Sequence, residues 1–172
     1  MEISQKMTTR IPLRLLQLLL ILVVGWGNSV VKPASQTPPN IAVNGSVSAP
    51  KARRGRTLSG MVVMDIPQGY HVNSNKPLEK FLVPTQLQIE APKGVVIGRV
   101  TYPRAIVRTF KFSKNKVAVY EGRAVMRFNI TVPRSFTSDS AELKGKLRYQ
   151  SCNDEVCFPP QTREVNLWVN IG

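Results

Sequence analysis

The sequence predicts an all-β protein built as an antiparallel sandwich. From Thr57 to the end of the chain, runs rich in Val, Ile, Tyr and Phe alternate with turns that contain Gly or Pro, which is the pattern of a sheet protein with short connections. No segment keeps a helical period over several turns. With 172 residues, 42% of them apolar, the chain is long enough for one core and an additional N-terminal segment.

The first residues have the pattern of a secretory signal. Lys6, Arg10 and Arg14 precede an apolar run from Leu15 to Trp26, as the charged and apolar parts of a signal peptide do. The run is short for a membrane span of about 20 residues. We therefore expect residues 1–28 to be a signal peptide, with an uncleaved N-terminal anchor as the alternative, and the rest of the chain to be exported to the periplasm.

Residues 29–56 differ in composition from the remainder of the chain. They are rich in Pro, Ser, Asn and Gln, show no apolar period, and end in the basic stretch KARRGR at 51–56. Such a composition is typical of a flexible linker. We expect the folded domain to cover residues 57–172.

Strands are expected wherever an apolar or alternating run lies between turn residues. They cover residues 57–66, 70–73, 85–90, 95–102, 105–112, 116–120, 122–132, 143–149 and 164–169. A turn at Pro67-Gln68-Gly69 separates the first two. In the run 122–132 we expect Val125, Phe128, Ile130 and Val132 on one face, with a slip or bulge near Met126.

The chain is strongly basic, with 24 Lys and Arg against 10 Asp and Glu and a net charge of +14. Such a surface favours an acidic partner or a position close to an anionic membrane. The basic residues are scattered over nearly every predicted strand and form no stripe with aromatic side chains, as a single-strand binder would have. Together with export, this predicts no nucleic-acid partner.

Cys152 and Cys157 are the only cysteines, and they lie in one short polar loop. They can form a disulfide if their Cα atoms come within roughly 7 Å. A loop of about six residues restrains the unfolded chain by only about 2 kcal/mol, against about 4.7 kcal/mol for about 100 residues. The pair is thus a weak structural link, which favours redox use; a small structural bridge and metal binding stay open. In an oxidising compartment the disulfide can persist at rest.

The residues around the cysteines bear on their reactivity. Asp154 and Glu155 lie between them, and nearby carboxylates disfavour a thiolate, so we expect raised thiol pKa values and a pair that reacts only with a docked partner. The segment Phe158-Pro159-Pro160 fixes the exit from the loop, because proline restricts the backbone.

His71 is the only histidine. A blue copper site needs two histidines, and a closed zinc site needs a fourth ligand that no motif supplies. We therefore predict no metal and no cofactor, and expect His71 to be a half-buried polar residue at a strand start. A G-x-S-x-G motif is also missing, so nothing in the sequence indicates a serine hydrolase.

Four stretches together resemble the N-terminal periplasmic domain of the thiol:disulfide interchange protein DsbD, also called the disulfide bond corrector domain. They are Gly69-Tyr-His-Val-Asn-Ser-Asn75, Phe81-Leu-Val-Pro-Thr-Gln-Leu87, Tyr149-Gln150-x-Cys152 and Cys157-Phe-Pro-Pro-x-Thr162. The resemblance covers about residues 45–172, with a C-x4-C spacing one residue shorter than in the best-known members. It implies an immunoglobulin-like sandwich and a cysteine pair that accepts electrons from a membrane-embedded partner. The recipients would be periplasmic thioredoxin-fold proteins, either disulfide isomerases or reductants of cytochrome c maturation.

The resemblance also implies roles for individual residues. Cys157 would attack the substrate disulfide and Cys152 would resolve the mixed disulfide. A cap loop at Arg108–Ser113 would shield the pair through Phe110 or Phe112. The family's residues beside the cysteines correspond to three positions, Tyr70, His71 and Asn73.

The sequence ends at Gly172 without a polytopic membrane segment, so we expect a DsbD-like electron donor to act in trans. The alternative is a non-catalytic basic sandwich that binds a partner and keeps a static structural disulfide.

Overall fold

The structure is a computed structural model that describes residues 37–172. The predicted signal peptide and the first part of the predicted linker lie outside this range. Within it, the chain forms strands and no helix. The described part of the chain therefore holds no helix that could cross a membrane.

Three four-stranded sheets make up the fold. The first contains, in spatial order, β1 (Ala42–Val47), β3 (Arg56–Asp65), β9 (Arg123–Val132) and β6 (Val96–Ile97). The second contains β2 (Lys51–Ala52), β12 (Gln161–Ile171), β10 (Ser140–Tyr149) and β5 (Gln86–Glu90). The third contains β11 (Ser151–Cys152), β4 (His71–Asn73), β8 (Val117–Tyr120) and β7 (Ile106–Arg108). Neighbouring strands are antiparallel except β2 and β12.

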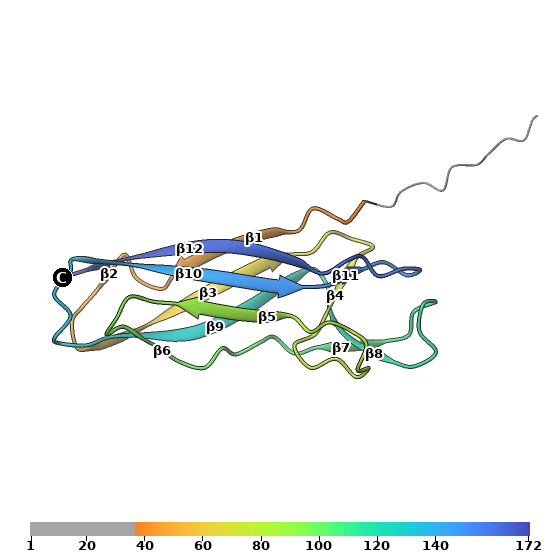
Figure 1. Ribbon diagram of the computed structural model, residues 1–172, viewed down its shortest axis with the longest axis horizontal. Helices are drawn as coiled ribbons and strands as arrows, with labels where there is room; N and C mark the ends of the chain where they lie inside the picture. The colour runs from red at the N-terminus through yellow and green to blue at the C-terminus, as the bar shows by residue number, and fades with distance from the viewer. Residues whose placement is uncertain (1–36) are drawn as a thin grey trace, which may run out of the picture. The chain divides into compact units, whose positions relative to one another are not determined.

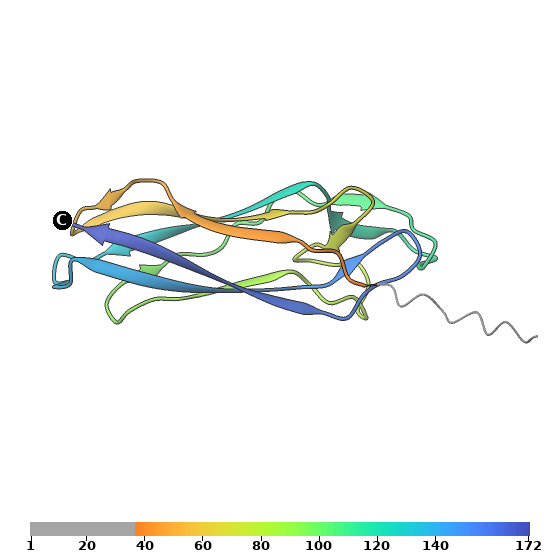
Figure 2. The same ribbon diagram turned by 90° about the horizontal axis from the view of Figure 1, so that it is seen from above.

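The first two sheets form the layers of the sandwich. Figure 2 shows β1 and β3 in one layer and β10 and β12 in the other. Alternate residues of the long strands point inward and are buried, among them Ala124, Met126, Phe128, Ile130, Val132, Ala141, Leu143, Leu147 and Tyr149. This period of two is what one buried face of a strand requires. The predicted all-β, immunoglobulin-like sandwich is confirmed.

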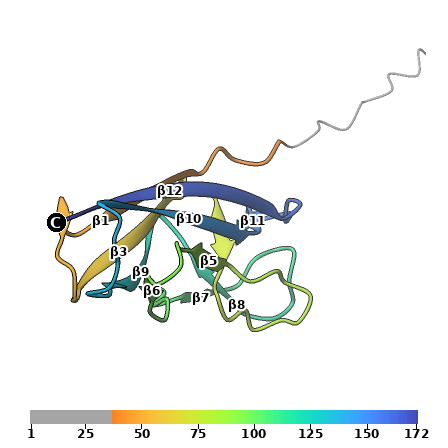
Figure 3. The same ribbon diagram turned by 60° about the vertical axis from the view of Figure 1, so that its left-hand side comes forward.

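The third sheet lies at one end of the two long sheets, opposite the C-terminus (Figures 1 and 3). It is joined to the second sheet because β11 follows β10 after a single residue, Gln150. The N–H of Asn73 in β4 donates to the carbonyl oxygen of Gln150 at 3.2 Å. The end of β10 therefore carries the first cysteine directly into the third sheet.

Two strands lie where the sequence predicts a linker, so that prediction is wrong for residues 42–56. β1 pairs with β3 along its whole length. Its inner face carries Val43, Gly45 and Val47, and a Cβ atom on Gly45 would lie 2.8 Å from the side chains of Leu167 and Val165. Glycine stands here because the side chains of Leu167 and Val165 come close to the backbone of β1. The strand therefore lacks the alternation of apolar residues from which a strand is predicted.

The predicted slip near Met126 is also wrong. β9 pairs with β3 in one unbroken register from Arg123 to Val132. Met126 points into the core with Phe128, while Val125 is on the outer face and only partly buried. Ala124 completes the inner row, which an expectation based on large apolar residues misses.

The region between β5 and β8 is less regular than predicted. The predicted strand 95–102 consists of β6 and one isolated bridge between Thr101 and Arg127. The predicted strand 105–112 ends at Arg108, and residues 109–116 form a loop.

The predicted turn at Pro67-Gln68-Gly69 is present. The Tyr70 N–H donates to the Pro67 carbonyl at 3.1 Å, and Gly69 has a φ of 81°, as the third position of a type II turn requires. The turn leads directly into β4, which begins at His71.

Candidate functional site

The two cysteines face each other across a short hairpin that begins at β11. Two backbone hydrogen bonds flank the pair, one on each side: Phe158 N to Ser151 O at 2.9 Å, and Asn153 N to Val156 O at 3.0 Å. Cys152 and Cys157 are therefore directly opposed at a non-hydrogen-bonded position, where antiparallel strands approach most closely. Their Cα atoms are 4.0 Å apart, and their sulfurs form a disulfide. The C-x4-C spacing thus closes a bridge within a regular hairpin.

The hairpin is held in shape by contacts that do not involve sulfur. Besides the two flanking backbone bonds, the side-chain oxygen of Asn153 accepts the N–H groups of Glu155 (2.9 Å) and Val156 (2.8 Å) at the tip. A side chain that binds the backbone in this way stabilises a tight turn. These contacts hold the two strands of the hairpin in register without help from the S–S bond.

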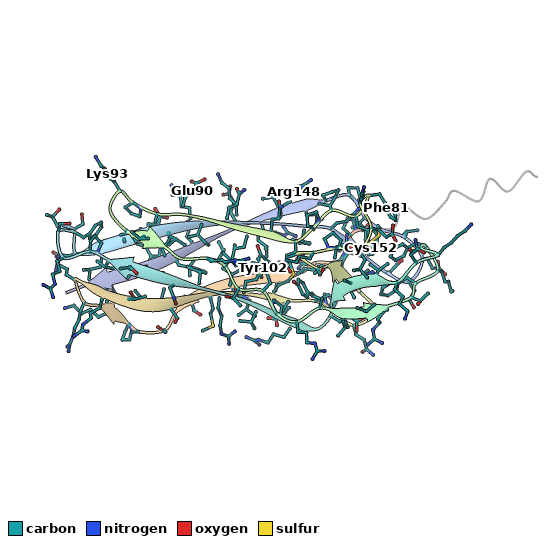
Figure 4. All side chains as sticks on the ribbon, turned by 90° about the horizontal axis from the view of Figure 1, so that it is seen from below. Phe81, Glu90, Lys93, Tyr102, Arg148 and Cys152 are labelled. Carbon is teal, nitrogen blue, oxygen red and sulfur yellow. A yellow bond between two sulfur atoms is a disulfide. The ribbon has the colours of Figure 1, made fainter. Side chains whose placement is uncertain are left out.

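The two cysteines differ in accessibility. Cys152 is fully buried, with 0% of its surface exposed, whereas Cys157 is only partly buried. Cys157 packs against a small apolar cluster that contains Leu82 and Phe110. Figure 4 shows Cys152 at the same end of the domain as the exposed Phe81, with Glu90 and Lys93 toward the other end. A visiting disulfide can thus reach Cys157 more readily than Cys152.

Gln150 connects the hairpin to β4 and to the loop before β5. Its side-chain nitrogen donates to the Phe158 carbonyl at 3.1 Å. Its side-chain oxygen accepts from Asn73 Nδ2 at 3.0 Å and from the Val83 N–H at 3.1 Å. Asn73, which the resemblance placed beside the cysteines, thus acts here through Gln150. Gln150 belongs to the cysteine motif, but nothing in the sequence indicates this linking role.

We expect Gln150→Ala to lower the free energy of unfolding of the oxidised protein by about 3 kcal/mol, because three partners lose their hydrogen bonds in a partly buried place. Gln161→Ala is the matched control. It removes an amide with one such bond, to the Tyr149 hydroxyl, and should cost about 1 kcal/mol. Urea unfolding monitored by circular dichroism measures both. Equal stability of the two variants would contradict this role of Gln150.

His71 lies under two aromatic rings. It is 2% exposed, so the expected half-buried residue is in fact buried. Its ring stacks on Phe110, with ring centres 3.9 Å apart and planes at 18°, and lies 5.9 Å from Phe112. Phe110 and Phe112 also stack on each other, with centres 5.4 Å apart. Both phenylalanines that the sequence proposes for the cap therefore cover His71.

Burial sets the charge of His71. It lowers the pKa of the imidazole to about 4, against the opposing effects of the Glu121 and Asp154 carboxylates. The cause is the cost of placing a charge in a poorly solvated site. At neutral pH His71 is therefore neutral.

This pKa predicts a loss of stability in acid. The unfolded chain binds a proton at His71 near pH 6.5 and the folded chain only near pH 4. Protonation thus favours unfolding as the pH falls through this window, by at most about 3 kcal/mol. Comparing urea unfolding at about pH 7 and about pH 5 for the wild type and His71→Phe isolates the effect. Between these pH values His71→Phe should lose less free energy of unfolding than the wild type. An equal loss would contradict the lowered pKa of His71.

The loop between β7 and β8, residues 109–116, contacts the cysteine hairpin through Lys111. The Lys111 N–H donates to the Asp154 carbonyl at 3.0 Å, and the Lys111 ammonium pairs with Glu155 at 3.4 Å on the surface. An exposed ion pair contributes at most about 1 kcal/mol. The connection is longer than the usual two to five residues of a hairpin. The loop therefore covers the site through its aromatic rings.

The carboxylates between the cysteines lie at the exposed tip of the hairpin. Lys111, which lies in the predicted cap loop but has no role predicted from the sequence, balances one of them, Glu155. The expected rise in thiol pKa applies to the reduced pair and stays a prediction. Tyr70 lies near the second strand of the hairpin, with its ring centre 6.2 Å from that of Phe158.

A cleft of about 710 Å³ borders the site. Its walls come from the turn before β4, the cap loop, the residues just after β8 and the tip of the cysteine hairpin, and include Tyr70, His71, Phe110 and Asp154. Arg108 and Glu121, also on its wall, form a two-bond ion pair at 2.8 and 3.1 Å. Among residues 37–172, no group of three or more His, Cys, Asp or Glu side chains is placed to hold a metal ion.

Comparison with known families identifies the family to which this chain belongs. The family model described as "Thiol:disulfide interchange protein DsbD, N-terminal" matches residues 40–168, most of the chain. The chain belongs to this family. The predicted resemblance is thereby confirmed, and the disulfide at Cys152–Cys157 lies in a domain of the thiol–disulfide exchange class. A search of curated proteins gave no match.

Two related solved structures are similar to this DsbD N-terminal family member. The N-terminal domain of Neisseria meningitidis DsbD, in its reduced form, is 19% identical, with a TM-score of 0.47, and the match covers 74% of this chain and 85% of that one. The N-terminal periplasmic domain of ScsB from Proteus mirabilis is 15% identical, also with a TM-score of 0.47. That match covers 74% of this chain and 44% of the ScsB chain.

Proposed function

We propose that this DsbD N-terminal family domain is a periplasmic dithiol carrier. In the reduced state the Cys157 thiolate attacks a disulfide of an exported thioredoxin-fold protein and displaces one of its thiolates. Cys152 then attacks the Cys157 sulfur and releases the second thiolate of the recipient, which leaves Cys152–Cys157 oxidised. Two electrons pass to the recipient. The recipients are disulfide isomerases or the reductants of cytochrome c maturation.

One observation carries the proposal: the hairpin presents one sulfur and buries the other. A carrier needs a first thiol that reaches its partner and a second thiol that reacts only within the molecule. Partly buried Cys157 and fully buried Cys152 fit these two tasks. The flanking hydrogen bonds hold the pair in register, so oxidation and reduction require little movement of the backbone.

Recharging the oxidised pair needs a reductant. A DsbD-like membrane component acting in trans would attack the Cys152–Cys157 disulfide and return both thiols. The predicted export signal and the excess of Lys and Arg in the remainder of the chain agree with work close to the anionic face of a membrane. The docking site would be bordered by Tyr70, Phe110 and Phe112. The carboxylates of Asp154 and Glu155 would keep the thiols protonated, and so unreactive, until a partner docks.

The reduction potential of the pair tests the proposal. We expect equilibrium with glutathione or dithiothreitol buffers, followed by mass spectrometry of alkylated thiols, to give a potential above about −300 mV. A carrier must be reducible by its donor, whereas a static structural bridge resists reduction. A potential below about −300 mV would favour the alternative, a binding module with an inert disulfide.

A further inference from the structure

His71, Cys152 and Cys157 lie in one row across three neighbouring chain segments. Cys152 pairs with His71 of β4 on one side and with Cys157 on the other. Directly opposed residues of antiparallel strands project on the same face, with Cβ atoms about 4.5–5.5 Å apart. The only histidine of the chain is therefore the cross-strand neighbour of Cys152, on the face that carries the disulfide.

The imidazole has an unused polar atom. His71 Nε2 is buried and has no hydrogen-bond partner, although buried polar atoms are nearly always paired. In a neutral imidazole one ring nitrogen accepts a hydrogen bond. The disulfide state offers no proton beside it, but reduction gives Cys152 an S–H group. Reduction thus places a new hydrogen-bond donor on Cys152, the cross-strand neighbour of the residue that carries this unpaired atom.

Resting on the proposed function, we infer that His71 is the proton acceptor for Cys152 in the resolving step. In the dithiol, Cys152 S–H donates to His71 Nε2. When the mixed disulfide has formed on Cys157, the proton moves to Nε2 and the Cys152 thiolate attacks the Cys157 sulfur. The bond between Cys157 and the recipient breaks, the recipient leaves as a thiolate, and the imidazolium returns its proton to solvent or to that thiolate.

The charges around His71 suit this task. Glu121, directly after β8, and Asp154 from the hairpin tip both favour the protonated imidazole. Arg108 from β7 is paired with Glu121, and Lys111 from the cap loop with Glu155, so neither cation is unbalanced beside the ring. While the cap is closed the imidazole is neutral and able to accept. Once the rings that bury it move away, water reaches it and it becomes a stronger base.

The two steps can be separated with a small aromatic disulfide, 5,5′-dithiobis(2-nitrobenzoate). Attack by Cys157 releases one coloured thiolate and leaves a mixed disulfide. Attack by Cys152 on Cys157 then releases the second. In stopped-flow measurements on the reduced protein, the first phase reports Cys157 and the second phase reports Cys152.

Two variants test the inference. His71→Phe keeps a ring against Phe110 and removes both nitrogens, and His71→Gln keeps a hydrogen-bond acceptor that cannot take the proton. At about pH 6 we expect both to slow the second phase at least about tenfold and the first phase less than about twofold. Their second phase should fall steeply with decreasing pH, whereas that of the wild type should fall less. A wild-type rate and pH profile in either variant would overturn the inference.

A matched control and a second readout keep the outcome interpretable. Tyr102 lies in the body of the sandwich, away from Cys152 (Figure 4), and its hydroxyl accepts the Leu87 N–H at 2.8 Å. Tyr102→Phe removes that hydroxyl and should leave both phases unchanged. If Cys157 of a Cys152→Ala chain never forms a mixed disulfide with any protein, the proposed function fails. If it does, but the His71 variants resolve normally, only the role of His71 fails.

Discussion

A Cys152→Ala chain will accumulate mixed disulfides through Cys157, whereas a Cys157→Ala chain will form almost none. The reason is the difference in accessibility, because Cys157 is partly buried and Cys152 is fully buried. Cys157 can attack a visiting disulfide, and without Cys152 nothing within the molecule resolves the product. Cys152 alone cannot reach a protein disulfide. We expect a difference of at least about 100-fold in trapped complex, as loss of a nucleophile gives.

The measurement is direct. Each reduced variant is mixed with an oxidised, exported thioredoxin-fold protein and quenched with acid, and complexes are separated on non-reducing gels and identified by intact mass. A chain that lacks both cysteines is the control for non-covalent association. Equal trapping by the two single variants would show that burial does not assign the roles. If neither variant forms a covalent complex, the result would count against the proposal that this domain is a dithiol carrier.

The second large effect concerns the cap. We expect Phe110→Ala to speed the oxidation of the reduced pair by oxidised glutathione about tenfold or more. Phe110 is 9% exposed and stacks on His71 beside the cysteines. The cap hypothesis holds that the wild-type pair reacts only in the small fraction of molecules whose cap is open. Removing the ring makes the open state common, and a rate that is limited by that fraction rises accordingly. Phe112→Ala, which removes the more exposed ring, should have the smaller effect.

Phe136→Ala is a suitable control for the cap. It removes a phenyl ring that packs against the main core and has no contact with the cap cluster. Its oxidation rate should stay within about twofold of wild type, because the open fraction of the cap is unchanged. Unchanged rates in both Phe110→Ala and Phe112→Ala would refute the cap.

Much of the fold is predictable from local patterns. Strand β9 can be predicted because its apolar residues alternate with charged and polar ones. The turn before β4 can be predicted because Pro67 and Gly69 fix its geometry. β1 was missed because Gly45 takes the place of an apolar side chain under Leu167 and Val165. A pattern based on side-chain hydrophobicity cannot detect a strand position such as Gly45, where the backbone and not a side chain packs against the core.

The site was predictable only in part for a similar reason. The spacing of the cysteines indicates a bridge, and the resemblance indicates which residues surround it. The register that makes His71 the neighbour of Cys152 depends on pairing between β4 and β11, strands about 80 residues apart in the sequence. The link through Gln150 and the pairing of Lys111 with Glu155 likewise join distant segments. Such contacts have no local signature.

The central claim is that Cys152–Cys157 exchanges its oxidation state with a protein partner. The most direct test mixes the reduced wild-type chain with an exported thioredoxin-fold protein in its disulfide form and follows the thiols of both by alkylation and mass spectrometry. The carrier predicts that this chain gains one disulfide for each disulfide that the partner loses. If every such partner stays oxidised while this chain keeps its two thiols, the claim is contradicted.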